Sequence, residues 1–194
     1  MKIAAKLLSV SILALGVLAS ARAAVETYVA DPAHSSINFT IRHIFTDIPG
    51  QFSKYTATVT VDRDNLENSS AEASIDIGSI STAQPKRDSD LQTPKFFDGL
   101  KFPTMTFKSK SWKKTGADTY DVTGDLTIKG VTKEIVLKVT SLGFGPGMRP
   151  GSMVSGWKAT TTLHRDDFGV SAYPKVLGAD VDVTINLEAG LKKT

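Results

Sequence analysis

The sequence predicts an all-β protein, an antiparallel barrel of about eight strands that is interrupted by one short helical insertion. Two observations lead to this prediction. Apolar and polar residues alternate with a period of two through most of the chain after residue 24, so each strand has one apolar and one polar face. No long amphipathic helix could cover the apolar face, whereas closing the sheet buries that face and removes unpaired edges. A two-sheet sandwich satisfies the same pattern and is the alternative.

Residues 1–23 have the composition of a secretory signal peptide, with two lysines near the start and an apolar run over Leu7–Leu18. The run is shorter than the about 20 residues that span a bilayer, and small residues end at Ala23 as at a signal-peptidase site. We expect cleavage between Ala23 and Ala24, a periplasmic location, and a single domain over residues 24–194. A retained membrane anchor is the alternative.

Net charge and cysteine content exclude two classes of function. The whole chain has 23 basic and 20 acidic residues, but Lys2, Lys6 and Arg22 lie in the expected signal peptide, so the mature chain is formally neutral. A neutral chain lacks the basic footprint of nucleic-acid binding. The sequence contains no cysteine, which excludes a disulfide framework and thiol chemistry.

Eight segments alternate in the way that half-buried antiparallel strands do, and they are rich in β-branched residues. In Ser35–His43, for example, Ile37, Phe39 and Ile41 alternate with polar residues. In chain order the expected strands are Ser35–His43, Lys54–Asp62, Ala71–Ile77, Thr104–Lys108, Tyr120–Ile128, Ile135–Leu142, Met153–Leu163 and Val181–Leu187.

Two segments interrupt this pattern and are the candidate covers of the barrel. After Ser81, a short helix is expected around Lys86–Leu91, and the apolar side chains of Phe96–Phe102 should pack on an apolar surface. Gly143–Gly151 contains four glycines and two prolines, which predicts irregular backbone. Because loops with few packed contacts open most readily, either segment is expected to move when a ligand enters.

Gly124–Val139 predicts a β-hairpin whose loop centres on Val131 and Thr132. In the expected register, apolar residues face each other on the inner side and opposite charges face each other on the outer side. The expected pairs are Leu126–Leu137 and Ile128–Ile135 inside, and Lys129–Glu134 and Asp125–Lys138 outside.

The apolar face of the strands is the candidate binding surface, either as a solid core or as the lining of a cavity. Small residues at inward positions, among them Ala57, Ala73 and Ala159, favour a cavity. The expected lining residues are Ile37, Phe39, Ile41, Phe52, Tyr55, Val59, Ile75, Ile77, Phe97, Met105, Phe107, Leu126, Ile128, Ile135, Leu137, Trp157 and Leu163.

Patterns of catalysis and metal binding are weak in this sequence. The three histidines have neither His-x-His nor His-x-x-x-His spacing, and the sequence has no Gly-x-Ser-x-Gly motif or glycine-rich phosphate loop. We therefore expect no catalytic residue, no metal and no required cofactor. The candidates for a polar mouth of the cavity are His34, His43, Arg87 and Asp88.

An ordered set of motifs resembles the YceI-like family of exported bacterial proteins over almost the whole mature chain. The matching segments are Asp31–Phe39 with Arg42-His43, Gly50–Phe52, Arg87-Asp88, Phe96–Asp98, Phe102–Phe107, Gly124–Lys133 and Arg165–Val170. Three positions depart from the family's pattern, with Asp90 in place of a His, Glu134 in place of a frequent Pro, and His164 in place of a frequent Asn. The first departure removes a histidine-based role for its loop.

This resemblance implies a lipocalin-like barrel that holds a long isoprenoid chain, such as a polyprenyl lipid or a quinone-type molecule, and it transfers no catalytic residue. Each buried CH₂ is worth about 0.8 kcal/mol, so such a chain can bind without a dedicated polar site. We expect binding, sequestration or transport of an apolar lipid, with transient contact to a membrane or a membrane redox protein. The alternatives are a redox or enzymatic accessory that acts on the bound lipid, and a stress-response interaction module with a solid core.

Overall fold

The computed structural model describes residues 25–193, so the expected signal peptide and its cleavage site lie outside the described residues. This part of the chain has eleven strands, one α-helix and three short 3₁₀ helices. No helix among these residues is long and apolar enough to cross a membrane. The elements are β1 (Glu26–Ala30), β2 (Ser36–His43), β3 (Thr46–Phe52), β4 (Tyr55–Val61), η1 (Leu66–Asn68), β5 (Ser70–Asp76), η2 (Ile77–Ser79), β6 (Ile80–Ser81), α1 (Pro85–Leu91), β7 (Thr104–Lys114), β8 (Thr119–Ile128), β9 (Val131–Pro146), β10 (Met153–His164), η3 (Arg165–Phe168) and β11 (Leu177–Leu191).

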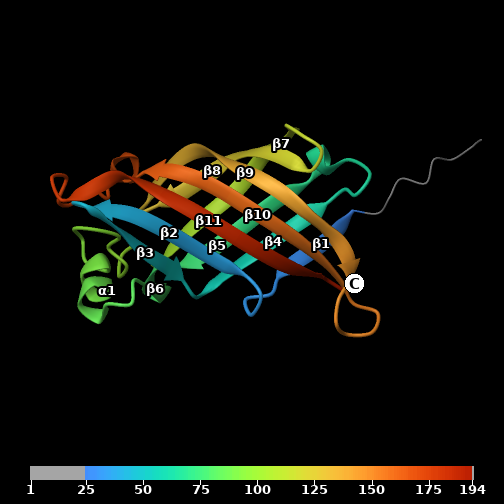
Figure 1. Cartoon of the computed structure of the whole chain (residues 1–194), viewed down its shortest axis with the longest axis horizontal. Helices are drawn as coiled ribbons and strands as arrows, with labels where there is room; N and C mark the ends of the chain where they lie inside the picture. The colour runs from blue at the N-terminus through green and yellow to red at the C-terminus, as the bar shows by residue number, and fades with distance from the viewer. Residues whose placement is uncertain (1–24, 194) are drawn as a thin grey trace, which may run out of the picture.

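The strands form one closed antiparallel barrel, in which β7, β8, β9, β10 and β11 are neighbours in chain order (Figure 1). Three positions in the barrel wall are each filled by two short strands. β1 and β2 share the position next to β11. In the next position β4 pairs with β1 and β3 pairs with β2, and in the third β5 pairs with β4 and β6 pairs with β3. The eleven strands therefore occupy eight positions of an up-and-down barrel. The prediction of an eight-stranded barrel is confirmed, and the sandwich alternative is wrong.

The ring closes where the start and the end of the barrel meet. Tyr28, Val29 and Ala30 of β1 pair with Leu191, Gly190 and Ala189 of β11. The other edge of β11 pairs with β10 along eleven consecutive residue pairs. Closure leaves the apolar faces inside, and Tyr28 and Ala189 are fully buried at the junction.

Three short strands of the structure, β1, β3 and β6, were not expected from the sequence, and β3 was missed because its sequence breaks the alternation. β3 contains Pro49 and Gly50, and proline lacks the N–H that a ladder requires. The structure accommodates Pro49 because β6 pairs only with Gln51 and Phe52, so the second edge of β3 is unpaired at the proline. β1 is a short strand of five residues at the start of the described chain.

The β8–β9 hairpin has a tighter turn than expected. Lys129 and Gly130, both with positive φ (51° and 76°), form the two-residue loop, and Ile128 pairs with Val131. The register is therefore shifted by four residues, and none of the four expected pairs forms: neither Leu126–Leu137 and Ile128–Ile135 inside nor Lys129–Glu134 and Asp125–Lys138 outside. Lys138 instead bonds Asp121, and Lys110 of β7 bridges Asp125 and Glu134. The inward faces were still predicted correctly, because a shift by an even number keeps every side chain on its face.

Part of the glycine-rich segment expected to be irregular is instead strand. β9 continues through Gly143 and Gly145 to Pro146 and pairs with β10 across a bulge at Leu142. Only the following turn, at residues 147–152, lies outside the strands. The expectation of irregular backbone over the whole of Gly143–Gly151 was wrong, because pairing with β10 satisfies the backbone of its first residues.

The helical insertion lies against one end of the barrel. Residues 82–103 contain α1 and pass below β3 and β6 at the left of Figure 1, and we call them the covering segment. Lys129 at the β8–β9 turn donates hydrogen bonds to the carbonyls of Pro94 and Gly169, at 2.8 and 3.0 Å. It thereby joins the covering segment to the loop after η3. We call this end of the barrel the α1 end.

Candidate functional site

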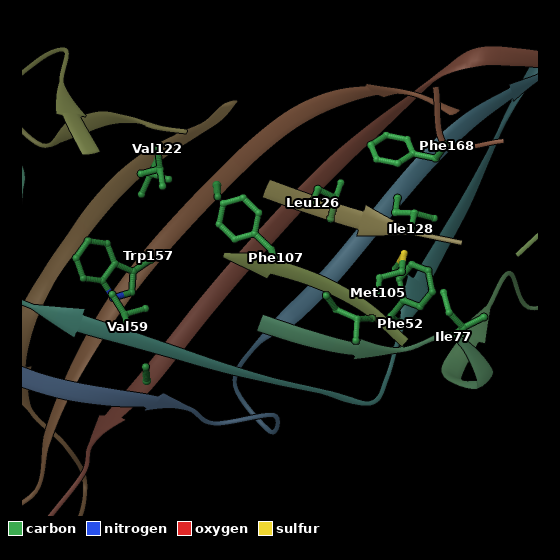
Figure 2. Close-up of a cluster of buried hydrophobic side chains, with 14 of the residues drawn as sticks. Phe52, Val59, Ile77, Met105, Phe107, Val122, Leu126, Ile128, Trp157 and Phe168 are labelled. Carbon is green, nitrogen blue, oxygen red and sulfur yellow. The ribbon is translucent and has the colours of Figure 1, made fainter. Parts of the chain in front are cut away.

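The barrel interior contains an elongated cavity of about 310 Å³. Its wall is built from alternate residues of nearly every strand, because successive side chains of a strand point to opposite faces. Figure 2 shows Trp157, Val122 and Val59 at one end of the interior, Phe107 and Leu126 near its middle, and Met105, Ile128 and Phe168 toward the α1 end. The volume lies at the lower end of the range of about 300–1,000 Å³ for small-molecule sites.

Every residue that the sequence analysis named as cavity lining lies on this wall except Ile77. The strand expected to run through Ile77 ends at Asp76, where the side chain of Asp76 accepts a hydrogen bond from Gly78 and starts η2. Ile77 is 1% exposed and lies under the covering segment, whose Gln92 donates a hydrogen bond to its carbonyl. Its placement on the cavity wall was wrong because the 3₁₀ turn takes the side chain out of the strand pattern.

An aromatic cluster closes the interior at the end opposite α1. Its members contact one another through tilted or perpendicular rings with centroids 5.5–6.0 Å apart. We call the cluster the aromatic floor; its members are Tyr28, Trp112, Tyr120, Phe144 and Trp157. The guanidinium of Arg63 lies over the ring of Phe144 on the outer side of the floor.

The sequence analysis missed Trp112, which lines the cavity and belongs to the floor. Met105 and Phe107 point inward at odd positions, but a bulge between Ser109 and Ser111 reverses the alternation, so that Trp112 also points inward. Extrapolating the period of two along β7 would place this tryptophan outside. The size and apolarity of the residue were the only available signal.

Among residues 25–193, two buried aromatic polar atoms have no hydrogen-bond partner, the Tyr55 hydroxyl and the Trp112 indole N–H. Trp112 lies perpendicular to Trp157 with ring centroids 5.6 Å apart, the arrangement in which ring edges meet a π face. Burial raises the pKa of Tyr55, and burial with the nearby Glu26 raises the pKa of Tyr28 to about 12. Both tyrosines are therefore neutral at physiological pH, and neither places a charge in the interior.

Polar side chains meet the cavity at the α1 end. His43, Thr82, Arg87 and Asp90 contribute to its lining there. Arg87 donates from Nε to the Thr82 hydroxyl at 2.7 Å and from Nη2 to the Thr82 carbonyl at 2.8 Å. The helix therefore holds a cation at the polar end of a cavity whose wall is otherwise mostly apolar.

Two other candidates for the polar mouth do not reach the cavity. Asp88 points back to Thr82 and accepts hydrogen bonds from its N–H and hydroxyl, which positions the start of α1. His34 lies on the loop between β1 and β2 and bonds Asp31 at 2.9 Å. That hydrogen bond raises the pKa of His34 and lowers the pKa of Asp31.

Arg165 is the second cation at the α1 end, and it is buried. Its N–H groups donate to the backbone carbonyls of Val170, Leu177 and Gly178, so it shapes the loop between η3 and β11. A buried guanidinium that is satisfied by carbonyls holds structure in place and is not free to bind a ligand's polar group. Arg87 is more available, because only two of its donors are used.

Comparisons with known proteins agree in sequence and in fold. The family model described as "YceI-like domain" matches residues 28–189. A "UPF0312 protein" of Pseudomonas savastanoi pv. phaseolicola is 35% identical over 190 residues, which cover 95% of this chain and 98% of the relative. The crystal structure of the Campylobacter jejuni YCEI protein is 32% identical, covers 79% of this chain and 91% of that chain, and has a TM-score of 0.72. A Saccharophagus degradans structure described as a polyisoprenoid binding domain is 14% identical, covers 87% of this chain and 100% of that chain, and has a TM-score of 0.65, which shows the shared fold.

Proposed function

The chain belongs to the YceI-like domain family, and from that premise we propose that it binds a long apolar lipid inside its barrel. The ligand class is a polyisoprenoid or an isoprenoid-quinone type of molecule. The mature protein sequesters or carries this lipid in the periplasm. No cofactor is required for this role.

The observation that supports the proposal is the elongated apolar cavity between the aromatic floor and the α1 end. Each CH₂ moved from water into such an interior contributes about 0.8 kcal/mol, so a ligand with many of them binds through its length and not through one polar contact. The cavity also argues against a solid-core interaction module. Arg87 and His43 would lie near whichever end of the ligand is more polar.

Extraction of the protein after purification in native buffer, followed by mass spectrometry of the organic phase, tests this proposal. We expect a co-purifying prenyl lipid, and uptake of added lipid by protein that has first been stripped. Repeated isolation of an empty barrel that takes up no prenyl lipid would contradict it.

A redox or enzymatic accessory is the second candidate, and the polar groups at the α1 end are the observation that favours it. Arg87 and Asp90 lie where the head group of a quinone would be accessible. Substitution of Arg87 by Gln separates the two roles. A carrier keeps its lipid content in this variant, whereas an accessory that acts on the head group loses turnover of the bound lipid while still containing it.

A further inference from the structure

Four exposed apolar side chains lie together on two loops at the α1 end. Ile44 and Phe45 form the tip of the β2–β3 hairpin and are 53% and 92% exposed, and Tyr173 and Val176 of the loop before β11 are 48% and 36% exposed. The Ile44 N–H donates to the carbonyl of Val176 at 2.9 Å, so the two loops are joined. We call these four residues the apolar rim. Scattered single apolar residues on a surface are ordinary, but a joined group of this kind marks an interaction site.

Two residues of the apolar rim have positive φ, a backbone conformation that glycine and asparagine adopt more readily. Ile44 has φ of 51° and Tyr173 has φ of 52°, where glycine or asparagine is the usual occupant and a β-branched residue is rare. The remaining positive-φ residues other than glycine in the described chain, Ala83, Asp98 and Lys129, also lie at this end. Such strain costs about 1–3 kcal/mol for each residue and is concentrated at functional sites. A polar hairpin tip would be both more soluble and less strained.

The rim borders the cavity. His43 directly precedes Ile44, Leu177 directly follows Val176, and both His43 and Leu177 line the cavity. The ring of Tyr173 contacts Phe96 of the covering segment, with centroids 6.0 Å apart. The opposite end of the interior is closed by the aromatic floor, so a ligand that enters along the axis of the barrel passes the rim.

In the described part of the chain, two unpaired positive charges lie beside the rim, while the nearby Asp47 carboxylate is paired with Arg42. Lys175 is the one charged residue of the loop 171–177. Lys95 lies with its ammonium 5.9 Å from the centre of the Tyr173 ring. Both lysines are exposed, and neither forms an ion pair within residues 25–193. Apolar and aromatic tips flanked by lysines fit the boundary between acyl chains and anionic headgroups.

We propose that the apolar rim docks the α1 end onto an anionic phospholipid surface, so that a lipid passes between the bilayer and the cavity without crossing water. This inference rests on the proposed function for its purpose, but the docking itself is measured separately. Phe45 and Ile44 insert among the acyl chains, and Lys95 and Lys175 contact the headgroups.

Binding of the full mature chain to vesicles tests the proposal. The probes are vesicles of phosphatidylethanolamine with phosphatidylglycerol, and vesicles of phosphatidylcholine alone, with bound protein measured by flotation. We expect F45S to weaken partitioning by about tenfold, the equivalent of burying most of one large apolar side chain. The double variant K95Q/K175Q should lose binding to the anionic vesicles and keep its weaker binding to the neutral ones.

Met148 supplies the matched control, because it is 99% exposed on a loop at the opposite end of the barrel. M148S should bind vesicles as the unchanged protein does. I44N is a second rim variant that suits the backbone of the hairpin tip, since asparagine tolerates positive φ. It should unfold no more readily than the unchanged protein and still bind vesicles more weakly.

The outcomes separate this inference from the proposed function. Equal vesicle binding by F45S and the unchanged protein overturns the docking, as does a loss in M148S of the same size. A change of oligomeric state in F45S by light scattering, without a change in vesicle binding, assigns the rim to a second copy of the chain and also overturns it. Loss of vesicle binding with an unchanged lipid content supports docking, whereas failure of the proposed function appears as an empty cavity in the unchanged protein.

Discussion

Substitution of Gly124 by alanine should destabilise the protein through one close approach inside the barrel. Gly124 lies in β8 beneath the ring of Phe107 on β7, and a Cβ at this position would lie 2.5 Å from Cζ of that ring and 2.6 Å from the carbonyl oxygen of Lys108. Carbon atoms pack best at about 3.5–4.0 Å, so the ring and the backbone must each move by about 1 Å. The Lys108 carbonyl belongs to the β7–β8 ladder and cannot rotate away as a side chain can.

The expected change in the free energy of unfolding of G124A is the sum of two opposed effects. Overpacking of a well-packed interior costs about 1–3 kcal/mol, while replacing glycine by alanine where φ is ordinary gains about 0.4–1 kcal/mol from the unfolded chain. The net loss in the free energy of unfolding should be about 1–2 kcal/mol, or about 2–8 °C in Tm for a chain of this size. Because Phe107 lines the cavity, its displaced ring should also reduce lipid uptake.

Urea denaturation and lipid uptake measure the two effects, and Gly145 provides the control. Gly145 lies in β9 and an added Cβ there would have no atom within 4 Å, so G145A should be neutral or slightly stabilising. In the double variant F107A/G124A the ring is absent, and the cost of G124A should fall by about 0.5 kcal/mol or more. If G124A is as stable as G145A, the steric argument is refuted.

Three further changes test the cavity, the joint at the α1 end and the surface charges. A159F fills the cavity and should abolish lipid uptake, whereas K158F, on the opposite face of β10, should leave it unchanged in the same fluorescence titration. K129M removes the two hydrogen bonds that join the covering segment to the loop after η3, so it should cost about 1 kcal/mol and speed both amide exchange in that segment and ligand exchange, while K133M should do neither. His34 has a raised pKa because of Asp31, so its contribution is present below its unfolded pKa of about 6.5 and lost as the pH rises through the folded value. H34Q should therefore be less stable than the unchanged protein near pH 5.5 and equal to it near pH 8.5, as measured by thermal unfolding at about these two values; equal stability at both pH values would contradict the assignment.

The faces of the strands could be predicted from the sequence, because a period of two survives errors in register. Leu126 and Ile135 were assigned to the interior from a hairpin that was four residues out of register, and both line the cavity. The period fails where a bulge inserts a residue, as it does before Trp112. It fails again where a 3₁₀ turn replaces the strand, as it does at Ile77. Bulges and 3₁₀ turns depend on contacts with neighbouring strands, and the sequence of one segment does not reveal those contacts.

The details of the α1 end could not be predicted, because they depend on residues in conformations that their types disfavour. The dipeptide Lys129-Gly130 does not by itself require positive φ at the lysine, and Val131-Thr132 was an equally reasonable centre for the loop. The structure supplies the reason. At φ of 51° Lys129 can direct its ammonium to two carbonyls from separate segments. The local backbone cost is thus offset by tertiary hydrogen bonds.

The same reasoning separates the two candidate covers of the barrel. The segment around Gly145 pairs with β10 beside the aromatic floor, where five large rings fill the interior, so its movement would not open a path to the cavity. The covering segment instead contributes Arg87, Asp90 and Phe97 to the cavity wall, and its hydrogen bonds to the barrel come from Lys129 and from contacts with Ile77. Movement there requires the loss of these hydrogen bonds and of the ring contacts of Phe96 and Phe97, but no change in the strand ladder. Ligand exchange should therefore respond to K129M and not to G145A, and the opposite result would place the route of exchange at the aromatic floor.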